Sequence, residues 1–222
     1  MNAILLSLSG GADSATMLAK YINDGRRVGA VFFDYGSKQN GMEIHAARSV
    51  AAHYGIRLGE LDVRGVFKGS RSAMMLDDGR AIPHSGYSET TMSQTVVPGR
   101  NAIFASILAS MAESADFAAI ALGMHGGDHH LYPDCRPAFA ASLAETIALS
   151  TEGKIRVETP FIRMSKAEII GLGVRLDVPY ALTRSCYAAD ALACGLCGTC
   201  VERREAFRAN GVVDPVRYQN SN

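Results

Sequence analysis

The junction between the first expected strand and the first expected helix constrains the fold most. Residues 3–8 form an apolar run that predicts a buried strand, and a helical pattern begins after Ala12. The segment at this junction reads Ser9-Gly10-Gly11-Ala12-Asp13-Ser14. Adjacent glycines allow a sharp turn that leaves backbone N–H groups at a helix N-terminus, which favours an anion. The pattern predicts a phosphate-binding loop, with an ordinary glycine-rich connection as the alternative.

Strands and helices alternate along the rest of the chain. Apolar runs that predict further strands stand at residues 28–33, 57–63, 117–122 and 155–158. Helical patterns separate most of these runs, and Ser165 has the character of a helix N-cap. The alternation predicts an α/β fold, with a Rossmann-like parallel sheet and helices on both faces. Ligands bind such sheets beyond the carboxyl ends of the strands.

The chain of 222 residues, with 48% hydrophobic content, is long enough for one sizeable core and a small added module. We expect a nucleotide-binding domain over residues 1–175 and a helical, cysteine-bearing element over 176–222. Residues from about 64 to 97 are rich in Gly, Ser, Thr and Asp and predict a long inserted loop. A loop of this length usually has a function.

The charge balance argues against a dedicated nucleic-acid binder. The chain has 22 basic and 22 acidic residues, whereas nucleic-acid binders normally carry a basic excess or a basic face. The cluster Arg203, Arg204 and Arg208 is interleaved with Glu202 and Glu205, so we expect a solvated helix face there. The apolar run at the N-terminus is too short for a signal peptide or a membrane span. We therefore expect a cytoplasmic protein with a small-molecule partner.

Four of the five cysteines lie close together near the C-terminus. Cys186, Cys194, Cys197 and Cys200 follow the spacing C-x7-C-x2-C-x2-C. Four thiolates suit a tetrahedral structural zinc site. An iron–sulfur cluster and a set of buried free thiols are the alternatives. Cys135 stands apart and is not counted as a ligand.

The whole set of motifs resembles one known family. Besides the N-terminal loop, it comprises Phe33-Asp34-Tyr35-Gly36, Val97-Pro98-Gly99-Arg100-Asn101, Tyr132-Pro133-Asp134-Cys135-Arg136, Glu158-Thr159-Pro160, Ser165-Lys166-Ala167-Glu168 and Ser185-Cys186-Tyr187. With the cysteine cluster, this set is similar to the QueC (ExsB) family, the 7-cyano-7-deazaguanine synthases. The family belongs to the PP-loop ATP pyrophosphatase superfamily. The resemblance runs from about Ile4 to Phe207.

The resemblance implies an ATP-dependent ligase that converts 7-carboxy-7-deazaguanine and ammonia into 7-cyano-7-deazaguanine. The carboxylate is adenylated, ammonia displaces AMP, and a second adenylation with elimination gives the nitrile. Asp13, Ser14, Arg100 and Lys166 are the implied catalytic residues, and ATP, Mg2+ and Zn2+ are the implied cofactors. Positioning and charge stabilisation are expected to supply most of the rate.

The same resemblance assigns binding residues. Those expected to hold the nucleotide are Leu8, Ser9, Gly10, Gly11, Asp13, Ser14, Asp34, Tyr35 and Gly36. Those expected to hold the deazaguanine are Arg100, Asn101, Asp128, Tyr132, Asp134 and Arg136. For Asp34, Arg100 and Lys166 the alternatives are a strand-end cap, a surface ion pair and a solvated charge.

One segment departs from the family pattern. Many members carry a Ser-Gly pair before the Tyr-Pro-Asp-Cys-Arg run, where this chain has His125-Gly126-Gly127-Asp128-His129-His130-Leu131. A second hypothesis is therefore a QueC-like ligase that stops at an amide or conjugates the deazaguanine to a protein or small-molecule amine. A third is a non-catalytic nucleotide or tRNA binder, which the balanced charge and the intact loop disfavour. We also expect a homodimer.

Overall fold

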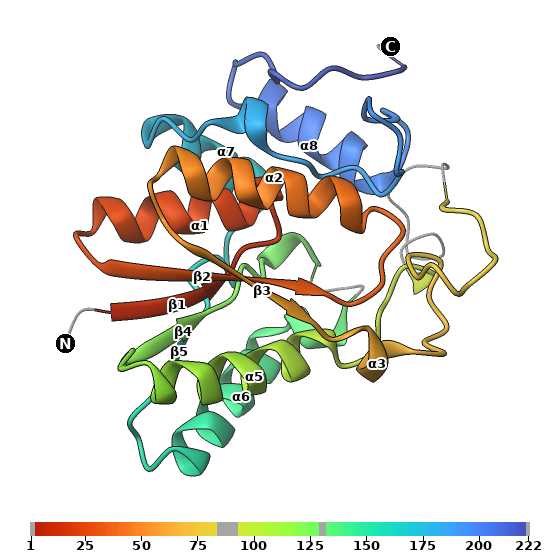
Figure 1. The fold of residues 1–222 in the computed structure, drawn as a ribbon. Helices are drawn as coiled ribbons and strands as arrows, with labels where there is room; N and C mark the ends of the chain where they lie inside the picture. The colour runs from red at the N-terminus through yellow and green to blue at the C-terminus, as the bar shows by residue number, and fades with distance from the viewer. Residues whose placement is uncertain (1–2, 84–92, 129–131, 221–222) are drawn as a thin grey trace.

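A twisted parallel sheet forms the centre of the molecule. The computed structural model describes residues 3–83, 93–128 and 132–220. Within them, a 5-stranded sheet has the order β3-β2-β1-β4-β5, and all neighbouring strands are parallel (Figure 1). The strands are β1 (Ala3–Ser7), β2 (Arg27–Asp34), β3 (Leu58–Asp62), β4 (Ala119–Ala121) and β5 (Arg156–Glu158). The predicted parallel sheet is confirmed.

Helices cover both faces of this sheet, as predicted (Figure 1). One face carries α1 (Ala12–Asn23), α2 (Asn40–His53), α7 (Lys166–Arg175) and α8 (Gly198–Ala209). The other face carries α5 (Arg100–Ser114) and α6 (Pro137–Ser150). A short helix, α3 (Arg64–Phe67), follows β3. No helix of the described residues is both long enough and apolar enough to cross a membrane.

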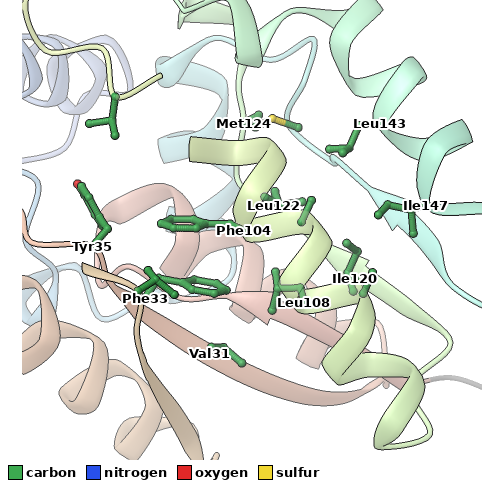
Figure 2. Packing of buried hydrophobic residues seen from close by; sticks show 14 of the residues in the cluster. Val31, Phe33, Tyr35, Phe104, Leu108, Ile120, Leu122, Met124, Leu143 and Ile147 are labelled. Atoms are coloured by element: carbon green, nitrogen blue, oxygen red, sulfur yellow. The ribbon is translucent and has the colours of Figure 1, made fainter. Parts of the chain in front are cut away.

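The strands are apolar along their length because both sides of the sheet are buried. In β1, Leu5 packs into the core beneath α5 and α6, whereas Ile4 and Leu6 pack into the core beneath α1, α2 and α7. Figure 2 shows the first of these cores, in which the rings of Phe33 and Phe104 stack with their centroids 4.2 Å apart. This stacking attaches the end of β2 to the first half of α5.

The strand order places a ligand crevice beside β1. After β1 the chain proceeds to β2 and β3 on one side, whereas β4 and β5 lie on the other side. The connections that leave the carboxyl ends of β1 and β4 therefore diverge, which is the usual ligand position in open α/β sheets. The Ser9–Ser14 segment follows β1, and His125 follows β4.

Two details differ from the expectations. The strand expected over 117–122 is limited to Ala119–Ala121, because its ladder with β5 spans only three residue pairs. The inserted loop, residues 64–97, begins with α3, and its residue Met75 forms an isolated bridge with Ser37.

Helix α8 packs on α7, and its residues Ala206 and Phe207 belong to the core beneath α1, α2 and α7. The predicted domain boundary at residue 175 stays a prediction.

The prediction of a solvated arginine face on α8 is wrong at Arg203. This side chain is only 1% exposed and donates to Asp214 over 2.8 and 2.9 Å and to Thr183 Oγ1 over 2.7 Å. The helical period brings Arg203 to the same buried face as Phe207, while Arg208 remains exposed. Neighbours in the sequence therefore do not share one environment here.

Candidate active site

A cavity of about 230 Å³ opens at the carboxyl ends of β1, β2 and β4. Its walls come from the N-terminal loop, the first turns of α2, α5 and α7, the segment after β4, and the C-terminal cysteine element. The predicted site residues among its walls are Ser9, Gly11, Asp13, Ser14, Tyr35, Arg100, Asn101, Tyr132 and Lys166. Segments that are far apart in the sequence therefore meet in one hollow.

The N-terminal loop is preorganised by its own hydrogen bonds. Ser9 Oγ and Ser14 Oγ are 3.1 Å apart, the Ser14 hydroxyl donates to the Gly11 carbonyl, and the Gly11 N–H donates to Ser9 Oγ. Gly11 is the N-cap residue of α1 and supplies no capping side chain, so the first N–H groups of the helix suit an anion. Gly10 has φ +80°, and a Cβ there would lie 2.6 Å from the Ala47 backbone nitrogen.

Lys166 and Asp13 form the central ion pair of the cavity. Lys166 is the first residue of α7, whose start is fixed by a capping box between Ser165 and Glu168, so the predicted N-cap is confirmed. Its Nζ donates to Asp13 Oδ2 over 2.6 Å. His125 Nε2 lies 3.8 Å from the same oxygen. Asp13 and Lys166 thus lie in contact although they belong to different helices.

The charge state of Asp13 follows from these neighbours. Burial raises the pKa of its carboxyl group, but the positive charge of Lys166, with His125 and the Lys166 hydrogen bond, outweighs burial and lowers the pKa below its usual value. Asp13 is therefore ionised at neutral pH. Its Oδ1 is buried and accepts no hydrogen bond from any residue that the structure describes.

Arg100 occupies the opposite wall. It is the first residue of α5, its Nη1 donates to the Tyr35 hydroxyl over 3.3 Å, and its guanidinium lies 5.5 Å from the centre of the Tyr35 ring. Burial raises the pKa of Tyr35 to about 12, so the phenol stays protonated at neutral pH. The Arg100 guanidinium therefore lies near the end of β2. Tyr35, the ring beside it, belongs to the core shown in Figure 2.

Some of the residues predicted to bind the deazaguanine line the cavity, whereas others lie outside it. Asn101 and Tyr132 line the cavity, and the Tyr132 hydroxyl is hydrogen-bonded to Thr95 Oγ1 at 2.7 Å. Asp134 does not line it: its carboxylate accepts the Asn101 backbone N–H over 3.1 Å at the start of α5. Arg136 is exposed at the N-cap of α6.

Some predicted positions stand behind the walls or outside the described residues. Leu8 and Gly10 support the loop from the core side, and Asp34 accepts the Gly36 N–H over 3.0 Å without lining the cavity. The predictions for the Asp128 side chain, His129 and His130 fall outside what the structure describes. His125 is described and lines the cavity.

The sequence analysis missed three charged residues that line the cavity. Glu43, from the first turn of α2, lines the cavity, and burial raises the pKa of its carboxyl group. The Arg184 guanidinium donates to three carbonyls of residues 188–191, and its backbone N–H donates to the Gly10 carbonyl over 2.8 Å. Glu202, assigned above to a solvated face, lines the cavity and lies 3.7 Å from Lys166. None of the three stands in a motif with an evident chemical role.

The cysteine quartet forms a compact, buried cluster beside the cavity. Its sulfur atoms lie within 4.8 Å of one another, and the sulfurs of Cys194 and Cys200 are 4.0 Å apart. Tetrahedral zinc with Zn–S bonds of about 2.3 Å places sulfurs about 3.8 Å apart, which this spacing approaches. Backbone N–H groups donate to the sulfurs of Cys186 and Cys194. The donor set therefore fits a metal ion.

Comparisons with known proteins agree with this geometry. Relatives called 7-cyano-7-deazaguanine synthase occur in Desulfotalea psychrophila, 40% identical over 96% of this chain and 97% of the relative, and in Paracoccus denitrificans, 40% identical over 96% and 91%. Among solved structures, the fold is similar to NMN synthetase from Francisella tularensis, with a TM-score of 0.53 at 14% identity over 96% of this chain and 78% of that chain. The model of the family described as "Queuosine biosynthesis protein QueC" matches residues 3–211. The chain belongs to the QueC family.

Proposed function

We propose that this protein is an ATP-dependent ligase that converts 7-carboxy-7-deazaguanine and ammonia into 7-cyano-7-deazaguanine through an adenylated carboxylate. The relatives that carry the synthase name support the substrate class. The observation that carries the proposal is the convergence of an anion-binding helix start, Lys166 and Arg100 on one cavity. A carboxylate becomes an acyl donor once its oxygen is joined to AMP, which can then leave. The adenylation step that forms this bond releases pyrophosphate, whose negative charge must be neutralised.

The N-terminal loop is assigned to the pyrophosphate end of ATP. The N–H groups that follow Gly11 and the hydroxyls of Ser9 and Ser14 supply donors, and Lys166 supplies a positive charge. The buried Asp13 Oδ1, without a donor among the described residues, fits one ligand of a Mg2+ ion. Mg2+ typically takes one or two carboxylates and completes its shell with phosphates and water. When bound, it would neutralise charge on the phosphates.

Tyr35, expected to hold the nucleotide, and Arg100, expected to hold the substrate, are assigned to the adenylated carboxylate that joins the two, because their side chains meet in the cavity wall. Asn101 and Tyr132 also line the cavity; Asn101 Nδ2 donates to the Asp134 carbonyl, and its side-chain oxygen is available to accept a hydrogen bond from a heterocycle. Asp134 positions Asn101 rather than flanking the deazaguanine, since its carboxylate is engaged at the start of α5. The charged groups hold the reacting carboxylate close to the nucleotide, which is how such sites gain rate.

The cysteine quartet is assigned to structural Zn2+. Four thiolates complete a tetrahedral shell and leave no position for a catalytic water. The quartet lies at the start of α8, and Thr199 and Glu202 of that helix line the cavity. The metal would therefore shape one wall of the active site.

A homodimer in the cytoplasm stays a prediction. Light scattering would test the oligomeric state, and cell fractionation would test the location.

The test is product analysis. The purified protein is incubated with ATP, Mg2+, ammonium and 7-carboxy-7-deazaguanine, and products are identified by mass spectrometry. We expect the nitrile, with two AMP released for each nitrile formed. An amide with one AMP, or an adduct with an added amine, would support the second hypothesis instead. No AMP above the level without the deazaguanine would contradict an adenylating enzyme.

A further inference from the structure

Lys166 lies between two carboxylates from distant parts of the chain. Its Nζ donates to Asp13 Oδ2 over 2.6 Å and lies 3.7 Å from Glu202 Oε2. The Lys166 side chain is 10% exposed and that of Glu202 is 17% exposed, so solvent screens this group only in part. A Cβ on Gly127 would lie 3.1 Å from Glu202 Oε1, so the glycine leaves room for the carboxylate.

The position of Glu202 depends on the cysteine quartet. Helix α8 begins at Gly198, with Cys197 as its N-cap residue and Cys200 in its first turn. Glu202 follows Cys200 by two positions. The Thr199 hydroxyl donates to the Ser185 carbonyl over 2.7 Å, which ties the same turn to the segment that carries Cys186. The first turn of α8 is therefore anchored on two sides, and Glu202 projects from an anchored backbone.

We propose that Glu202 is a positioning residue that holds the Lys166 ammonium group at the pyrophosphate end of the cavity. The inference rests on the proposed function, since the leaving pyrophosphate is the group that Lys166 neutralises there. A lysine has a flexible stem with many rotamers, and one partner restrains it less than two. In this role Glu202 acts through Lys166, 3.7 Å away. Its negative charge also repels the phosphates of bound ATP.

These two effects predict an unusual kinetic signature for Glu202→Gln. The glutamine keeps the shape of the side chain but loses the charge, so ATP binds severalfold more tightly while Lys166 is held less firmly. We expect kcat to fall about tenfold, less than the hundredfold or more that loss of a direct donor costs. The KM for ATP should fall with it, whereas the KM for the deazaguanine should change little. Glu202→Asp should recover part of kcat.

The matched control is Glu205→Gln, which removes the same charge from an exposed position of the same helix. Its kcat and KM values should equal those of the wild-type protein. If Glu202 were only a packing residue, its loss would reduce the active fraction and lower kcat at an unchanged KM for ATP. A kcat for Glu202→Gln within twofold of wild type would also overturn the proposal.

A second measurement is independent of turnover. Acetic anhydride modifies Lys166 in the ligand-free protein at a rate that peptide mass spectrometry can follow. We expect severalfold faster modification in Glu202→Gln, an intermediate rate in Glu202→Asp and the wild-type rate in Glu205→Gln. Equal rates in all four proteins would overturn the role of Glu202. If the wild-type protein forms no adenylated product, the proposed function fails, while this rate still decides whether Glu202 restrains Lys166.

Discussion

Lys166 Nζ donates to Asp13 Oδ2 over 2.6 Å, although the two residues stand 153 positions apart in the sequence. Asp13 belongs to the first turn of α1, which follows β1, and Lys166 is the first residue of α7, beyond the last strand. The contact of α1 with α7 on one face of the sheet brings the two helix starts together. The ion pair thus connects the N-terminal loop to the last part of the α/β fold.

Loss of either partner of this pair should stop ATP consumption without unfolding the protein. We expect Lys166→Met and Asp13→Asn each to reduce AMP release by about a hundredfold or more, because a preorganised charge is removed where negative charge develops. The matched control is Lys154→Met, which breaks an exposed ion pair with Glu113 on the surface. AMP release is measured by chromatography and folding by circular dichroism. Wild-type AMP release from Asp13→Asn would show that the loop is assigned wrongly.

Gly10 should tolerate alanine far less well than Gly25. Both glycines have positive φ, so alanine costs each about 1 kcal/mol of backbone strain. At Gly10 the added Cβ would also lie 2.6 Å from the Ala47 nitrogen and 2.7 Å from the Glu43 carbonyl, whereas at Gly25 no atom lies within 4 Å. We expect Gly10→Ala to lose the increase in Tm that ATP produces, and Gly25→Ala to keep it. Equal responses in thermal shift measurements would refute the close packing of the loop on α2.

The metal content should depend on the quartet and not on the fifth cysteine. Cys197→Ser should lower bound zinc from one equivalent and lower Tm, because metal binding contributes to folding free energy. Cys135→Ser is the control, since Cys135 packs in the core beneath α5 and α6 and lies outside the quartet. Elemental analysis and calorimetry measure both quantities. If the wild-type protein contained iron and labile sulfide, the quartet would hold an iron–sulfur cluster and the zinc assignment would be wrong.

The buried pair of Arg203 and Asp214 should contribute stability that depends on pH. Burial raises the pKa of Asp214, but its hydrogen bond and charge interaction with Arg203 lower the pKa below the usual value. A carboxyl group with a lowered pKa adds stability that is fully present above its unfolded pKa of about 3.9 and is lost as the pH falls through the folded value. Asp214→Asn should cost about 3 kcal/mol at pH 7, because it leaves a buried guanidinium without its charge partner.

Urea denaturation at several pH values measures this contribution. The difference in unfolding free energy between the wild-type protein and Asp214→Asn should stay constant from pH 7 to pH 5. It should narrow below about pH 4, where the unfolded chain takes up a proton at this carboxyl group. A difference that widens toward acid pH would contradict the ion pair.

Local sequence patterns were enough to predict the α/β class, the loop between β1 and α1, and the grouping of the four cysteines. A strand buried on both faces must be apolar along its length, and a helix N-cap favours a short polar side chain such as that of Ser165. The N-terminal loop was recognised because its glycines and hydroxyls are contiguous. The motif set also indicated the QueC family, which the family comparison shows.

Only the tertiary structure decided which charged groups face the cavity. The sequence places Glu202 and Arg203 side by side among other charges, yet one lines the cavity and the other is buried against Asp214. Asp134, expected beside the substrate, accepts a hydrogen bond from the Asn101 backbone N–H at the start of α5, and its role toward the substrate stays a prediction. Local periodicity tells which residues share a helix face, but the environment of that face depends on which elements pack against it. A charge is buried only where packing supplies its partner, and those partners are distant in the sequence.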